Sequence, residues 1–176
     1  GQLKPITLEQ AEADGRIGVG DIRHFSQQQL LSLDACMECG RCEDVCPAFA
    51  THKPLSPKRV VQDLKGVMER LNTVTEDTPL NPHETIGAET LWSCTACSAC
   101  VATCPVRIDQ LTLILDLRRH LTGEGGLSGT AATALRRMQS SSNPWGFPAD
   151  ERANWIAPPA MGINRQAVDF EYVRFN

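Results

Sequence analysis

Eight cysteines, in two runs of identical spacing, are the strongest chemical signal in this chain. Each run reads C-x2-C-x2-C-x3-C-P, and no further cysteine occurs in the 176 residues. The first run is Cys36, Cys39, Cys42 and Cys46, and the second is Cys94, Cys97, Cys100 and Cys104. This spacing is typical of thiolates that ligate two 4Fe-4S clusters, so the sequence predicts a protein that transfers electrons.

The spacing also predicts how the thiolates are shared. In two-cluster proteins of this kind, the first three thiolates of a run hold one cluster and the fourth ligates the other. The predicted ligand sets are Cys36, Cys39, Cys42 and Cys104 for the first cluster, and Cys94, Cys97, Cys100 and Cys46 for the second. Pro47 and Pro105 follow the fourth cysteines, where a fixed φ and a missing N–H end the local turn.

Three other uses of these cysteines are less consistent with the spacing. Zinc also binds four thiolates, but usually through two C-x2-C pairs with a longer spacer, so a structural zinc module is a remote alternative. Disulfides are typical of exported chains, and no secretory segment is visible here. A cluster that acts on substrate leaves one iron without a protein ligand, whereas eight thiolates match eight irons. We therefore expect a non-catalytic electron-transfer part of an oxidoreductase, with no catalytic residue.

Composition and charge limit the partners. A hydrophobic fraction of 41% and a charged fraction of 22% fit one compact unit. The formal charge of -4 would become about -8 with two oxidised clusters, and no run of Lys and Arg forms a basic stripe, so we expect no nucleic acid partner. The most apolar stretch, residues 111–115, is far shorter than the roughly 20 residues of a spanning helix. We therefore expect no transmembrane segment in the chain itself.

Four helices are expected around the cysteine runs. Ser56 and Pro57 suit the start of a helix, and apolar residues then follow helical spacing to Leu71, a stripe that we expect to pack on the clusters. The other three helices are expected at residues 26–33, 109–121 and 130–139. Strand signals are scarce, so the predicted fold is mainly α: an alpha-helical ferredoxin domain that holds two 4Fe-4S clusters.

The texture of the sequence suggests three regions. Residues 1–25 show little apolar periodicity and are expected to form an extended N-terminal tail. Residues 26–140 are the predicted two-cluster domain, with an internal repeat at a constant offset of 58 residues. Residues 141–176 are expected to form a loop, a short helix over 148–155 and a linker near 158–162, leading toward a downstream domain or partner.

Residues between and near the ligands have two interpretations each. Arg41 could favour the reduced state of a cluster or could be a solvated side chain, and Trp92 could shield a cluster or could be an ordinary packed indole. The four histidines are not paired at helical spacing, and we interpret them as surface imidazoles: His24, His52, His83 and His120.

Several segments together resemble a known family. They are C-M-E-C-G-R-C-E-D-V-C-P-A-F-A-T at residues 36–51, K-P-L-S-P-K at 53–58, L-W-S-C-T-A-C-S-A-C at 91–100, C-P-V at 104–106, R-R at 118–119 and N-P-W-G at 143–146. The chain resembles, over roughly residues 20–156, the iron-sulfur segment of heterodisulfide-reductase-related membrane oxidoreductases. The nearest likeness is to the electron transfer flavoprotein:quinone oxidoreductase branch.

The resemblance implies a function and partners. In that branch, a haem b membrane domain precedes the two-cluster segment and a cysteine-rich catalytic part follows it. The chain would then relay single electrons between a flavoprotein-linked or cysteine-rich catalytic part and a membrane haem b/quinone part of a respiratory oxidoreductase. Residues 169–172 resemble the approach to the first downstream repeat, which implies a middle segment of a longer polypeptide.

The alternative is a complete small subunit, of the kind found in heterodisulfide reductase or anaerobic glycerol-3-phosphate dehydrogenase complexes. Under both interpretations, labile clusters and the lack of an export signal lead us to expect the cytoplasmic side of the inner membrane, with peripheral attachment through partner subunits or domains.

Overall fold

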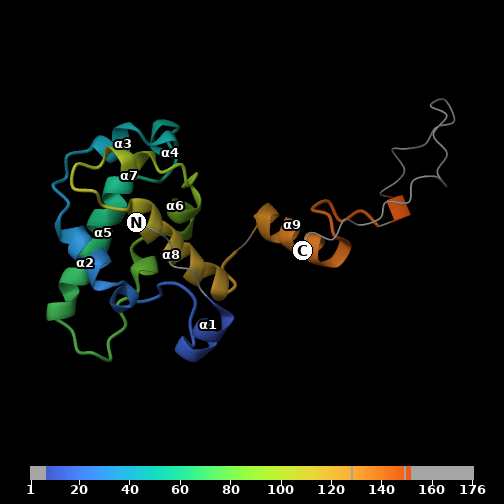
Figure 1. Cartoon of the computed structure of the whole chain (residues 1–176), viewed down its shortest axis with the longest axis horizontal. Helices are drawn as coiled ribbons and strands as arrows, with labels where there is room; N and C mark the ends of the chain where they lie inside the picture. Colours follow the sequence, from blue (N-terminus) through green and yellow to red (C-terminus); the bar gives the residue numbers. More distant parts are fainter. Residues whose placement is uncertain (1–6, 128, 149, 152–176) are drawn as a thin grey trace. The chain divides into compact units, whose positions relative to one another are not determined.

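The structure is a computed structural model that describes residues 7–127, 129–148 and 150–151. Every regular element in these residues is a helix, which confirms the predicted mainly α fold (Figure 1). The chain divides into two compact units, residues 1–126 and 127–176. The sequence suggested boundaries at residues 25 and 140. In this division, the residues before 26 belong to the first unit, and residues 127–140 belong to the second.

Three longer helices form the frame of the first unit. They are α2 (Gln27–Asp34), α5 (Pro57–Glu69) and α8 (Gln110–Gly123). Each begins at an N-cap whose side chain accepts a backbone N–H: Ser26 from Gln29, Ser56 from Arg59 at 2.9 Å, and Asp109 from Thr112 at 3.0 Å. Ser26 and Gln29 form a capping box at the start of α2. The predicted helices at 26–33, 56–71 and 109–121 are thus confirmed, with α5 ending slightly earlier in the short 3-10 helix η2 (Arg70–Asn72).

The apolar faces of these helices meet in one hydrophobic core. From α5 the core receives Val60, Val61, Leu64 and Val67, and from α8 it receives Leu113, Ile114 and Leu117. The connecting segments add Leu80 and Ile86, which flank the 3-10 helix η3 (Pro82–Glu84). The α5 stripe, which was expected to pack on the clusters, lies in this core together with Cys46, and the core is also contacted by Cys36, Cys94 and Cys104. The first turn of α5 lines the pockets at the cysteines.

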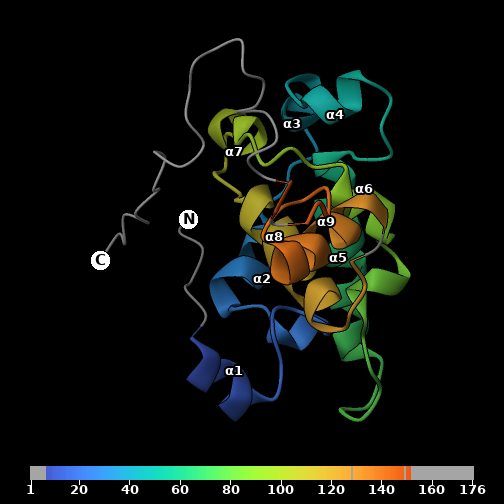
Figure 2. The same ribbon diagram turned by 90° about the vertical axis from the view of Figure 1, so that its right-hand side faces the viewer.

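Short helices carry or flank the cysteine runs. α3 (Arg41–Asp44) and α4 (Pro47–Ala50) belong to the first run, and α6 (Ala88–Trp92) and α7 (Ala99–Thr103) to the second. α3 packs against α7, so the two runs lie side by side although their equivalent cysteines are 58 positions apart in the sequence. In both Figure 1 and Figure 2, α3, α4 and α7 lie at one end of the first unit and α1 lies at the other.

The segment before residue 26 is not a simple extended tail. It contains α1 (Leu8–Asp14) and the 3-10 helix η1 (Ile22–His24), and it buries Val19, Ile22 and Phe25 in the core. The N–H of Val19 donates to the carbonyl of Asp116 on α8 at 3.0 Å, and that of Ile22 donates to Leu80 at 3.0 Å. These long-range bonds have no local periodicity, which is why the sequence pattern does not reveal them.

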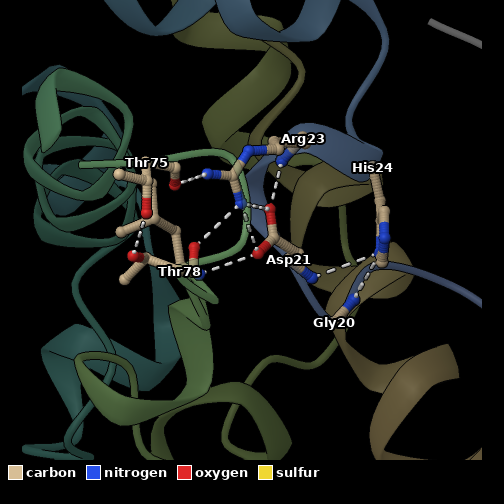
Figure 3. Close-up of polar contacts among 7 residues, drawn as sticks. Gly20, Asp21, Arg23, His24, Thr75 and Thr78 are labelled. Atoms are coloured by element: carbon tan, nitrogen blue, oxygen red, sulfur yellow. Dashed lines mark hydrogen bonds and ion pairs between the residues drawn. The ribbon is translucent and has the colours of Figure 1, made fainter. Parts of the chain in front are cut away.

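A polar network joins this segment to the loop after η2 (Figure 3). The Asp21 carboxylate accepts the backbone N–H of Leu80 at 2.7 Å and forms an ion pair with Arg23 at 3.1 Å. The Arg23 guanidinium also donates to the carbonyls of Thr78 at 3.1 Å and Thr75 at 3.4 Å. Burial acts to raise the pKa of Asp21, but the hydrogen bonds and the Arg23 charge outweigh it and leave that pKa below its ordinary value.

The second unit contains α9 (Gly129–Ser141), which confirms the helix expected at residues 130–139. After it, the Asn143 side chain donates to the Phe147 carbonyl at 2.6 Å and accepts the Phe147 N–H at 3.0 Å, closing the N-P-W-G turn on itself. The short helix expected at 148–155 lies largely outside the described residues, and the linker at 158–162 and residues 169–172 lie wholly outside them.

Gly18→Ala tests the close approach of the N-terminal segment to α8. Gly18 has φ +72°, and a Cβ there would collide with the Asp116 carbonyl and lie 2.5 Å from the backbone nitrogen of His120. We expect a loss of at least about 2 kcal/mol, seen as a thermal midpoint about 4–8 °C lower. The control is Gly66→Ala, in the exposed middle of α5, where a Cβ meets nothing within 4 Å. It should leave the midpoint unchanged or raise it; equal midpoints for both variants would contradict the packing.

Candidate iron-sulfur site

The two cysteine runs have the same backbone conformation. Glu38 and Ala96, two residues after the first cysteine of each run, both have φ +56°, and Gly40 and Ser98, four residues after it, have φ +79° and +64°. A left-handed conformation costs a non-glycine residue of order 1–3 kcal/mol and persists where the surroundings require it. The repeat in sequence is therefore also a repeat in structure, because the backbone turns at the same two positions in each run.

Each of the two resulting cavities is lined by four thiols. The first cavity is lined by Cys36, Cys39, Cys42 and Cys104, and the second by Cys46, Cys94, Cys97 and Cys100. The volume free of protein atoms, including adjoining open solvent, is about 310 Å³ in the first cavity and about 330 Å³ in the second. Every cysteine predicted as a ligand thus lies at one of two adjacent cavities, and the fourth cysteine of each run lies with the first three of the other.

The surroundings of the thiols fit 4Fe-4S clusters. The N–H of Ala96 donates to the Cys94 sulfur at 3.4 Å, and that of Ile108 donates to the Cys104 sulfur at 3.3 Å. Amide donors of this kind stabilise negative charge on sulfur. In the second cavity the remaining wall includes Leu55, Leu111 and Ile114, which exclude water from one side.

Burial controls the protonation of the thiols in the metal-free chain. It raises the pKa of Cys42 to about 11 and that of Cys100 to about 12, with smaller contributions from neighbouring cysteines. Cys97 is exposed, and hydrogen bonds from the Ala99 amide and the Thr95 hydroxyl lower its pKa. Iron binding must therefore displace protons from Cys42 and Cys100, whereas Cys97 is the more readily ionised thiol.

An ion pair between a lysine and a glutamate lies beside the first cavity. The Lys58 ammonium, on the first turn of α5, lines this cavity and contacts the Glu43 carboxylate at 2.7 Å. Glu43 also accepts the hydroxyl of Ser56, the N-cap of α5. Burial acts to raise the pKa of Glu43, but Lys58 and Ser56 lower it overall, so the carboxylate is ionised.

A guanidinium lies behind the second cavity. Arg118, on α8, donates to the Leu91 carbonyl at 2.9 Å and to the Cys94 carbonyl at 2.6 Å, and its guanidinium lies 5.0 Å from the centre of the Trp92 ring. Trp92 is therefore a partner of Arg118, with 37% of its surface exposed, and is not a buried cluster shield. In the sequence, Arg118 stands out only as part of the R-R pair at residues 118–119, and its contacts, Leu91 and Cys94, lie 27 and 24 residues away.

The other residues singled out in the sequence lie away from the thiols or in solvent. Arg41 is exposed, which agrees with the interpretation of a solvated side chain. His83 and His120 are not independent surface imidazoles: their rings stack at 5.2 Å, and His83 contacts the Val19 carbonyl at 3.2 Å. His24 accepts the N–H groups of Gly20 and Asp21 (Figure 3), and His52 is exposed.

Two features are absent from the residues that the structure describes. No helix in them is sufficiently long and apolar to cross a bilayer. No three His, Cys, Asp or Glu side chains in them converge on a point closely enough to hold a single metal ion.

Comparison with known proteins agrees with this geometry. Residues 32–108 match the family model described as the 4Fe-4S dicluster domain. A "Probable membrane-anchored ferredoxin" from Chromohalobacter salexigens is 40% identical, over 88% of this chain and 26% of its own length. The "EtfAB:quinone oxidoreductase" of Syntrophomonas wolfei is 34% identical, over 85% of this chain and 24% of its own length. The chain thus spans about a quarter of these two relatives.

A shorter relative represents the second branch. It is one of the subunits of the ferredoxin:CoB-CoM heterodisulfide reductase of Methanosarcina acetivorans, and it is 29% identical, over 62% of this chain and 46% of its own length. Both predicted branches are therefore among the relatives of this chain, and the segment of this chain that matches the dicluster domain includes all eight cysteines.

The crossed ligand assignment stays a prediction, and double variants test it by iron content. Cys46 and Cys97 belong to the same predicted set, so Cys46→Ser together with Cys97→Ser should remove one cluster and leave about four irons per chain. Cys46→Ser with Cys39→Ser should remove both clusters, because these thiols belong to different sets. The measurement is iron analysis of protein purified without oxygen. If the first double variant loses all iron and the second keeps about four, the crossing is wrong.

Proposed function

We propose that this chain relays single electrons between a flavoprotein-linked catalytic part and a membrane haem b/quinone part of a respiratory oxidoreductase. The match of residues 32–108 to the 4Fe-4S dicluster domain supports this proposal, and so do the relatives named above, an EtfAB:quinone oxidoreductase and a heterodisulfide reductase subunit. The observation that carries this proposal is the pairing of two four-thiol cavities across the packed helices α3 and α7. When bound, a 4Fe-4S cluster supplies one-electron chemistry.

The residues of the chain have three tasks in this proposal. The eight thiols hold the clusters and leave no iron for substrate, which favours transfer over catalysis. The packing of α3 against α7 holds the two sites next to each other. Cys39 and Cys97, the second ligand of each run, are exposed, so each site has one edge that a partner can approach.

The proposed partners follow from the names of the relatives. One relative is named as membrane-anchored and another as a quinone oxidoreductase that acts with EtfAB. A membrane haem b/quinone domain or subunit and a flavoprotein or cysteine-rich catalytic domain or subunit are the proposed neighbours. Attachment to the cytoplasmic side of the inner membrane would then be peripheral, through these neighbours.

A second candidate function is that of a small iron-sulfur subunit in a heterodisulfide reductase or anaerobic glycerol-3-phosphate dehydrogenase type complex. The relation to the Methanosarcina acetivorans protein favours it, because that match covers nearly half of a shorter protein. The quinone-linked branch has the stronger support, with 34% identity over 85% of this chain against 29% over 62%.

Stopped-flow absorbance tests the relay in the intact protein or complex that contains this chain. Mixing with reduced electron transfer flavoprotein should bleach the absorbance near 400 nm, and a quinone should restore it. Cys97→Ser should slow quinone reduction at least about 100-fold, because one site of the relay is lost. The control is Ser93→Ala, next to Cys94 in the sequence; the Ser93 hydroxyl donates to the Glu89 carbonyl at 2.8 Å. It should keep the wild-type rate. Full-speed quinone reduction by Cys97→Ser would contradict the proposal.

A further inference from the structure

The two thiol cavities have opposite electrostatic surroundings. Among the residues that the structure describes, no charged side chain lines the second cavity, and the Arg118 guanidinium donates to the backbone carbonyl of Cys94, whose thiol lines it. Among the described residues, no carboxylate forms an ion pair with Arg118; its donors go to carbonyl oxygens, and its open face lies over Trp92. The second cavity therefore has one positive charge beside it without a compensating negative charge.

The first cavity has a cation too, but that cation is neutralised. Lys58 contacts Glu43 at 2.7 Å, and their side chains are 29% and 15% exposed. Glu38 also lines this cavity, so Glu38, Glu43 and Lys58 together contribute a formal charge of one negative unit. The buried amide of Gln110 faces the same cavity with its oxygen unpaired, but an amide carries no net charge.

A nearby positive charge stabilises an added electron, and a nearby negative charge destabilises it. This Coulomb effect is strongest where water is excluded, and the net charge near a 4Fe-4S centre is one of the determinants of its reduction potential. Desolvation lowers the pKa of Arg118, while the charge of the Cys94 thiolate acts in the opposite direction, which indicates that the guanidinium and this ligand interact.

We propose that the site of Cys46, Cys94, Cys97 and Cys100 has the higher reduction potential of the two, and that Arg118 is the positioning residue that raises it. The inference rests on the proposed two-cluster relay and gives that relay a direction. When one electron is present on the two clusters, it would reside mainly on the second one. The first site, where Glu43 neutralises the charge of Lys58, has the lower potential and accepts electrons from the donor. The second site passes them to the acceptor.

A redox titration of the cluster-loaded protein, followed by electron paramagnetic resonance, tests the assignment. Cys39→Ser and Cys97→Ser identify the two signals, because these residues belong to different cavities whether or not the fourth ligands cross. In wild-type protein, the signal that Cys97→Ser abolishes should have the higher midpoint potential. Arg118→Gln should lower that midpoint so that the ratio of reduced to oxidised sites falls at least tenfold at a fixed potential, which is 59 mV for one electron.

The neighbouring residue supplies a matched control. Arg119→Gln removes the same charge from the same turn of α8, but Arg119 forms an ion pair with Asp116 at 3.0 Å. It should change the ratio less than threefold at either site. Arg118→Lys keeps the charge without the forked contact to two carbonyls and should lower the second midpoint by less than Arg118→Gln does.

A variant at the other cavity keeps the test decisive if Arg118→Gln fails to fold. Glu43→Gln can retain the contacts with Ser56 and Lys58 but no longer neutralises the charge of Lys58. It should therefore raise the midpoint potential of the first site, so that the ratio of reduced to oxidised first sites rises at least threefold at a fixed potential. The midpoint of the second site should not change. A higher wild-type midpoint at the first site overturns the inference, and so do equal shifts at both sites in either variant. Partners are absent from this measurement, so it can fail while quinone reduction through the chain succeeds, and the reverse.

Discussion

The packing of α3 against α7 is the contact on which the site depends. Each helix is only four or five residues long, too short to be stable alone, and each follows an N-cap residue in the left-handed conformation, Gly40 or Ser98. The contact between them brings the fourth cysteine of each run to the cavity of the other. Neither four-thiol cavity can form from one run alone, so the two sites assemble together.

The rest of the first unit supports this contact. Helices α2, α5 and α8 share a buried core, and the loop at Gly18 closes onto α8 where a side chain would not fit. Two of these helices place a cation near the cysteines. Lys58, in the first turn of α5, forms an ion pair with Glu43, whereas Arg118, on α8, donates to carbonyl oxygens. The internal repeat that makes the two sites alike in backbone does not extend to these charges, and this difference separates the two sites chemically.

Much of this could be predicted from the sequence, because local signals carry it. Cysteine spacing indicated the cofactor, and Ser26, Ser56 and Asp109 marked the starts of the longer helices. The short helices beside the cysteines could not be predicted, since four or five residues contain too little periodicity. The burial of Ile22 and the contacts of Arg118 were missed for another reason: their partners, Leu80, Leu91 and Cys94, are distant in sequence and follow from packing alone.

The electron relay requires that each four-thiol cavity hold a 4Fe-4S cluster. Analysis of iron and acid-labile sulfide, on wild-type protein purified without oxygen, measures this requirement without any partner protein. We expect about eight irons and about eight sulfides per chain, with brown protein that dithionite bleaches. Colourless protein that contains about two zinc ions and no sulfide would contradict the relay, because four thiolates around one ion would then explain each cavity.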